Sequence, residues 1–164
     1  MKKCFVLGLC LLLLFSGCGK KTVHTESDIL SIVVKPIAYG EESRIFTFDF
    51  EMGIWTEWYS ADVMPYDFAG NISEAGAYQE HEMSPKGMEN FRNAAAAAEF
   101  LNWKDSYTGG ATMDGMIWEI VITFAGGETK TISCFHAYPM TWDDMGEAFS
   151  DLANMQILES VENR

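Results

Sequence analysis

Two residues late in the chain carry the side chains of a nucleophilic enzyme. Cys134 and His136 are two positions apart in a run rich in β-branched and aromatic residues. Residues at this spacing on a β-strand project from the same face, with backbone positions about 6.6 Å apart. Cysteine hydrolases and transferases use such a thiol and imidazole as nucleophile and base. Ile132 shares the expected face, and a lone cysteine commonly behaves as a small buried hydrophobe, so we expect a core thiol and keep the enzyme as an alternative.

A second group of polar residues has the side chains of a metal site but not its spacing. Glu80, His81 and Glu82 are consecutive, and neighbouring residues do not share a face of a helix or strand. The spaced histidine pair of a zinc helix is absent, as is the alternation of acids that forms a calcium loop. Gly109-Gly110 lacks the lysine of a phosphate loop. We therefore expect neither a metal centre nor a cofactor.

Aromatic residues provide the best indication of a binding site. Trp55, Trp58 and Tyr59 fall within one expected strand, and Tyr66 follows in the next loop. Since side chains alternate between the faces of a strand, Trp55 and Trp58 are expected on opposite faces. An exposed tryptophan stacks on a sugar ring or anchors a protein partner. The alternative is that Trp58 belongs to a second core layer under a helix.

These residues depend on strands that the hydrophobic pattern predicts. A β-branched run at 29–34 predicts a first strand, and Pro36 at its end favours an edge position. Phenylalanines alternate with polar residues over 44–51, which indicates a half-buried strand. The segment 54–63 is expected to return as its partner in a hairpin.

A second hairpin is expected towards the C-terminus. Apolar residues alternate over 118–124, Gly126-Gly127 provides the turn, and 128–138 returns. One short strand is also expected near Tyr78.

Two helices follow the two hairpins. Ser84 is expected to cap the first, with Pro85 in its first turn and helical spacing of apolar residues continuing through 86–103. Thr141 is expected to cap the second, with Asp144 completing a capping box. The predicted fold is α+β, with two antiparallel β-hairpins in a sheet packed against two helices in a single domain.

The N-terminus has the plan of a signal peptide. Lys2 and Lys3 precede an apolar stretch from Cys4 to Phe15, and small residues follow. As a helix, these twelve apolar residues would reach about 18 Å, which is short of a bilayer core of about 30 Å. We expect export rather than a permanent membrane span.

The end of this leader resembles a bacterial lipoprotein signal. Phe15-Ser16-Gly17-Cys18 is similar to the short box that precedes the lipidated cysteine, although Phe15 stands where leucine is usual. The resemblance implies cleavage before Cys18 and a diacylglyceryl thioether on it. The expected division is a signal peptide at 1–17, the lipidated cysteine and a tether at 18–28, the domain at 29–158 and a tail at 159–164.

Charge and cysteine usage constrain the partners of the exported chain. Removal of the leader takes Lys2 and Lys3 from the 11 basic residues, which leaves nine against 24 acidic ones and a net charge of about −15. Such a surface repels nucleic acid and anionic lipid, so membrane attachment must come from acyl chains. Cys4 and Cys10 are lost with the leader and Cys18 is expected to carry lipid, so no cysteine is left to form a disulfide with Cys134.

The domain itself resembles an uncharacterised domain of small lipoproteins from Gram-positive gut bacteria, over roughly residues 44–155. The similar residues lie in turns and strands: Asp114-Gly115, Trp118, Gly126-Gly127, Ala137-Tyr138-Pro139 and Trp142. Cys134 and His136 stand where that family is expected to have glycine and asparagine. The resemblance implies a bacterial envelope protein but no activity.

The sequence thus predicts a lipid-anchored protein on the extracytoplasmic face of the cell membrane. We expect a non-catalytic binding or interaction module for a small molecule, a glycan or a protein. One alternative is a cysteine-dependent hydrolase or transferase that uses Cys134 and His136. The other is a structural or immunity-like surface lipoprotein that functions by occupying a surface.

Overall fold

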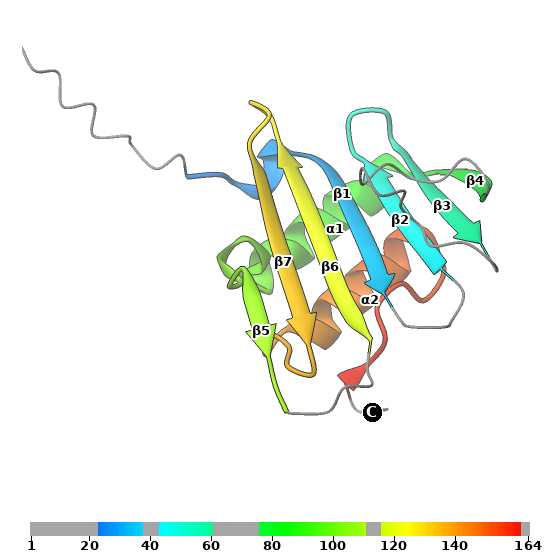
Figure 1. The fold of residues 1–164 in the computed structure, drawn as a ribbon. Helices are drawn as coiled ribbons and strands as arrows, with labels where there is room; N and C mark the ends of the chain where they lie inside the picture. Colours follow the sequence, from blue (N-terminus) through cyan, green and yellow to red (C-terminus); the bar gives the residue numbers. More distant parts are fainter. Residues whose placement is uncertain (1–22, 38–42, 61–75, 111–115, 162–164) are drawn as a thin grey trace, which may run out of the picture.

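A seven-stranded sheet organises the domain, and Figure 1 shows it as a single twisted layer. The computed structural model describes residues 23–37, 43–60, 76–110 and 116–161. The spatial order of the strands is β4-β3-β2-β1-β6-β7-β5. Only the β5–β7 pair is parallel, so the sheet is mixed. The strands are β1 (Ile29–Ile37), β2 (Ser43–Asp49), β3 (Ile54–Ser60), β4 (Ala77–Glu82), β5 (Ser106–Thr108), β6 (Ile117–Phe124) and β7 (Thr129–Phe135).

Both expected hairpins are present, and the α+β class is confirmed. β2 pairs antiparallel with β3, and β6 pairs antiparallel with β7. The left-handed φ of +70° at Gly53 shows why glycine is suited to the first turn. β4 agrees with the short strand expected near Tyr78. The two hairpins supply four of the seven strands, so they account for only part of the sheet.

The expected edge position of the first strand is wrong. β1 lies in the middle of the sheet, between β2 and β6. Its pairing with β2 ends at Val34, whereas its pairing with β6 continues through Pro36 to Ile37. Proline lacks a backbone donor, but it is tolerated where a strand is paired on one side only. Pro36 therefore marks the end of the β1–β2 pairing rather than an edge strand.

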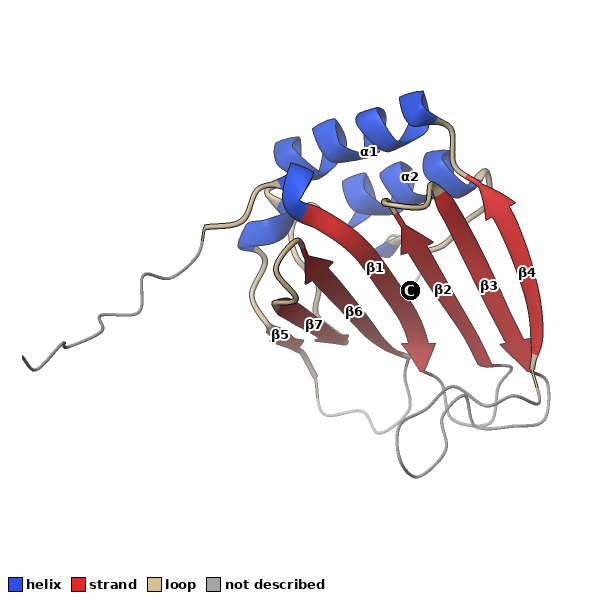
Figure 2. Ribbon diagram, turned by 90° about the horizontal axis from the view of Figure 1, so that it is seen from above, coloured by secondary structure: helices blue, strands red, loops and turns tan. Residues whose placement is uncertain are grey.

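Two helices cover one face of the sheet, as Figure 2 shows from above. α1 (Pro85–Ala97) is capped by Ser84, whose hydroxyl accepts a hydrogen bond from the Gly87 backbone N–H at 3.0 Å. α2 (Trp142–Ala153) lies beside α1. No helix among the described residues is long and apolar enough to cross a membrane.

The first helix is shorter than expected. α1 ends at Ala97, and the left-handed Glu99 (φ 51°) leads into a short 3-10 turn, η2 (Phe100–Asn102). This break turns the fully buried Phe100 into the core. The helical spacing that continued to residue 103 therefore reflects two separate elements that bury the same side of the chain.

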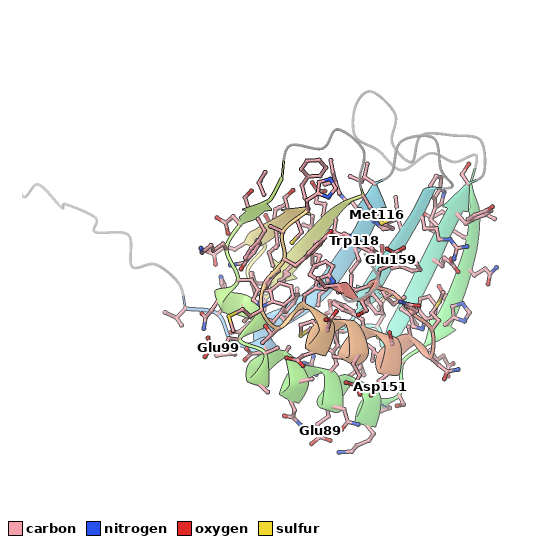
Figure 3. All side chains as sticks on the ribbon, turned by 90° about the horizontal axis from the view of Figure 1, so that it is seen from below. Glu89, Glu99, Met116, Trp118, Asp151 and Glu159 are labelled. Atoms are coloured by element: carbon pink, nitrogen blue, oxygen red, sulfur yellow. The ribbon has the colours of Figure 1, made fainter. Side chains whose placement is uncertain are left out.

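The space between the helices and the sheet is filled by apolar side chains. Figure 3 shows this layer from below, with Trp118 inside it and Glu89 and Asp151 on the outer sides of the helices. Phe149 of α2 lies at its centre, with ring centroids 4.9 Å from Phe91 of α1 and 5.2 Å from Phe48 of β2. This core lies on the face of the sheet that the two helices cover.

Thr141 joins the two helices instead of capping its own. It stands at the N-terminal boundary of α2, but its side chain makes no capping hydrogen bond, so the predicted capping box is wrong. Its hydroxyl donates to the Ala98 carbonyl at 2.8 Å and accepts from the Trp103 indole N–H at 3.1 Å. The hydroxyl thus satisfies one buried donor and one carbonyl at the end of α1.

The substitution Thr141→Val should lower the free energy of unfolding by about 2 kcal/mol. It keeps the β-branched shape but leaves the indole N–H of Trp103, a residue only 5% exposed, without its acceptor. Urea denaturation of the two proteins measures the change. Thr131→Val, at an exposed position of β7, is the matched control and should shift the value by less than about 0.5 kcal/mol. Equal effects of the two substitutions would contradict the bridging role of Thr141.

Candidate functional site

Cys134 lies in the core. Its position on β7 is opposite Trp118 of β6 and beside Tyr107 of β5. Its exposed fraction is 0%, and it belongs to the same buried cluster as Ile132 and Trp118. A substrate therefore cannot reach the Cys134 thiol in this conformation.

His136 departs from the geometry on which the enzyme alternative depends. β7 ends at Phe135, and His136 has a left-handed backbone with φ 54°. The alternation of strand faces does not extend to His136, so it no longer predicts that this imidazole shares a face with Cys134. The His136 ring packs edge-on against Phe135, with centroids 4.3 Å apart. The structure thus gives the Cys134 thiol the surroundings of a core residue.

The Cys134 thiol should react with iodoacetamide only when the protein unfolds. In the full chain carrying Cys4→Ser, Cys10→Ser and Cys18→Ser, Cys134 is the remaining thiol. Its alkylation, followed by mass spectrometry, should be slow in buffer and complete within minutes in denaturant, because alkylation requires an accessible thiolate. Rapid alkylation of the native chain would instead revive the cysteine enzyme.

The expected aromatic binding residues are not gathered on one open surface. Trp55 faces the helices, and its indole stacks on the His81 ring with centroids 4.2 Å apart. Trp58 faces the other way and is only 1% exposed. Tyr59 is half-buried, with the Arg44 guanidinium 5.4 Å from its ring centre. Tyr66 lies outside the described residues.

Trp58 belongs to a second apolar layer on the helix-free face. Its cross-strand partner Ile45 is equally buried, and the backbone of Gly76 lies against its indole so closely that a Cβ there would overlap the ring. Both described helices cover the opposite face, so the helix expected over Trp58 is absent from this part of the structure. The indole is buried and offers no stacking face to a ligand.

The substitution Trp58→Ala should destabilise the fold by about 3–5 kcal/mol, as expected for truncation of a buried tryptophan. Tyr78→Ala is the matched control because Tyr78 is the cross-strand partner on β4 and is 60% exposed. We expect its cost to stay below about 1 kcal/mol. Chemical denaturation measures both changes. A small loss for Trp58→Ala would remove it from the core and return it to the binding candidates.

The structure reveals that β4, the short strand expected near Tyr78, lies at an edge of the sheet, a position that the sequence pattern did not identify. β4 is the terminal strand of the sheet and is paired with β3 alone among the described strands. All six of its residues are exposed. Strand geometry separates the three consecutive polar residues, since His81 packs on Trp55 of the helix-covered face while Glu80 and Glu82 share the opposite face. No apolar alternation marks β4, so only the pairing shows its edge position.

A groove of mixed polar and apolar lining lies along α2. It has a volume of about 580 Å³ and runs between α2 and the segment 154–160. Asp143, Glu147 and Asp151 line it at every fourth residue, and the Asp143 carboxylate accepts a hydrogen bond from the Val161 N–H at 3.0 Å. Nowhere in the described residues do three or more His, Cys, Asp or Glu side chains lie close enough together to hold a metal ion. The groove is therefore an acidic surface feature without the arrangement of a metal centre.

The start of the described chain is packed against the domain. The His24 ring stacks on the Phe124 ring, with centroids 3.9 Å apart, and its Nε2 contacts the Glu128 carboxylate. The Thr25 backbone N–H donates to the Asp28 carboxylate at 2.7 Å, and this hydrogen bond lowers the pKa of Asp28. The Asp28 carbonyl accepts from the Ala125 N–H at 2.8 Å. The C-terminal part of the expected tether, from His24 onwards, thus lies on the β6–β7 turn.

Comparison with known proteins gives no family to which the chain belongs. No family model matches it, and a search of curated proteins found no significant relative.

Proposed function

We propose that this chain is an exported lipoprotein, anchored through Cys18, whose α+β domain is a non-catalytic binding module. The leader and the box that ends in Cys18 support the anchor. The observation that supports binding is β4, a wholly exposed strand at the end of a larger sheet. An exposed strand edge carries backbone groups that pair readily with another chain. The cysteine hydrolase or transferase is less well supported, because it requires an accessible Cys134.

The packed N-terminal segment would hold the domain close to the lipid. His24 lies six residues after Cys18, and six extended residues span at most about 21 Å. The anchored end of the domain would therefore be the end that carries η1 (Glu26–Asp28) and the β6–β7 turn (Figure 1). β4 lies at the far edge of the sheet, three strands from β1. This arrangement leaves β4 open to a partner at the cell surface.

Acyl chains must supply the attachment in this proposal. The strongly acidic chain is repelled by anionic headgroups, whereas each buried CH₂ contributes about 0.8 kcal/mol. A single chain binds membranes marginally, and the two chains of a diacylglyceryl group anchor stably. The role of Cys18 is thus separable from every property of the folded domain.

The substitution Cys18→Ser should abolish membrane attachment. The full chain, expressed in a bacterium that processes lipoproteins, should partition into the detergent phase of a Triton X-114 extract. Its N-terminal peptide should begin at Cys18 with the mass of a diacylglyceryl group. Cys18→Ser should shift at least about nine-tenths of the protein to the aqueous phase or leave the leader uncleaved.

Cys10→Ser is the matched control for this experiment, because it removes a thiol from the same leader. It should leave both the partition and the peptide mass unchanged. Detergent-phase partition that survives in Cys18→Ser would argue against the lipoprotein.

A further inference from the structure

The exposed edge of β4 is the longer of the two edges of the sheet. The other edge is β5, a strand of only three residues, whereas β4 has six. Edge strands of natural proteins are commonly short, interrupted by proline, covered, or protected by charged side chains. β4 contains no proline, and each of its six residues is exposed. The backbone groups of β4 that point away from β3 are therefore accessible along three two-residue repeats of the strand.

The two acidic side chains of β4 lie on one face. Glu80 and Glu82 are two residues apart, so they project from the helix-free face about 6.8 Å from each other. Asp49 of β2 lies on the same face, because its cross-strand partner Ile54 is paired with Glu82. Tyr78 completes the β4 row and is 60% exposed. A strand paired with this edge therefore lies beside Tyr78, Glu80 and Glu82, which occupy every second position of β4.

The charges of this row disfavour a second copy of the chain. Antiparallel pairing of β4 with another β4 gathers four carboxylates on one sheet face, within about 4.5–8 Å of their neighbours. Like charges opposite one another destabilise strand pairing. The high negative charge of the whole chain adds to this repulsion. The same row attracts a strand that carries cations at alternate positions.

We propose that β4 binds an extended segment of a partner protein by strand addition, with Lys or Arg at alternate positions facing Glu80 and Glu82. This inference rests on the proposed function as a binding module and names its partner class. Backbone hydrogen bonds to β4 hold the segment, and the carboxylates select its charge and register. In the bound segment, the side chain two positions from the cation that faces Glu80 packs on the Tyr78 ring.

Cyclic β-hairpin peptides provide the probe. One carries an outer strand Lys-Thr-Lys-Thr-Lys, a second replaces each lysine with glutamate, and a third is the lysine peptide with methylated backbone nitrogens on that strand. Cyclisation reduces the entropy lost on binding. Dissociation constants are measured with the full chain in detergent at about 0.1 M salt, where exposed charges still interact. Amide hydrogen exchange of residues 77–82 reports whether β4 becomes paired.

We expect the lysine peptide to bind, to slow exchange across β4 and to lose affinity on backbone methylation. The double variant Glu80→Lys/Glu82→Lys should bind it about tenfold more weakly and should gain affinity for the glutamate peptide. Glu147→Lys/Asp151→Lys makes the same change of charge on exposed positions of α2 and should alter affinity less than about threefold. Circular dichroism verifies that both variants are folded.

Several outcomes overturn the inference. They are an absence of binding, equal losses in the two double variants, no protection of β4, and indifference to backbone methylation. Protection of another surface would overturn strand addition at β4 but leave the binding module standing. A concentration-dependent dimer with protected β4 would show that the occupant is a second copy. Loss of the lipid anchor affects none of these measurements, so the failure of one proposal is distinguishable from the failure of the other.

Discussion

Phe149 is the side chain on which the arrangement of this domain depends. Its ring contacts Phe91 of α1 at 4.9 Å, Phe48 of β2 at 5.2 Å and Phe100 of η2 at 6.2 Å between centroids. With Phe149 itself, these residues come from four elements, of which β2, α1 and α2 are distant in sequence while η2 directly follows α1. Burial of aromatic rings is a major source of stability, and tilted rings add specific geometry. One buried residue of α2 thus sets the packing of both helices against the centre of the sheet.

The placement of both helices on one face has consequences for the other. The helix-free face is completed by side chains of the sheet itself, including an ion pair of 2.7 Å between Lys35 and Glu119 on adjacent strands. Trp58 and Ile45 are buried on this face without a helix above them. Among the described residues, no strand pairs with the outer side of β4, so this edge is open while β3 and β2 behind it are paired on both sides. A stable core and an accessible backbone edge therefore occur in the same sheet.

The successful predictions came from local patterns. Alternating phenylalanines in β2 and the glycines between β6 and β7 determine strand and turn within a few residues. Ser84 likewise identifies the start of α1, because an N-cap acts on the backbone only three residues away. The central position of β1 was missed, since its neighbours β2 and β6 are chosen by packing rather than by the run itself. The role of Thr141 was missed for the same reason, because its partner Ala98 is 43 residues away.

The sequence by itself determined the acidity of the chain and the local identity of its principal strands and helices, and it predicts an export leader that ends in a cysteine. Each follows from residues close together, because propensity, capping and charge act over one or two turns of chain. The tertiary structure alone decided that Trp58 is buried, that Cys134 lies in the core and that β4 ends the sheet. Exposure is a relation between distant segments, and a strand becomes an edge only because no other strand is placed beside it. The binding surface proposed for this protein is therefore a property of the assembled sheet.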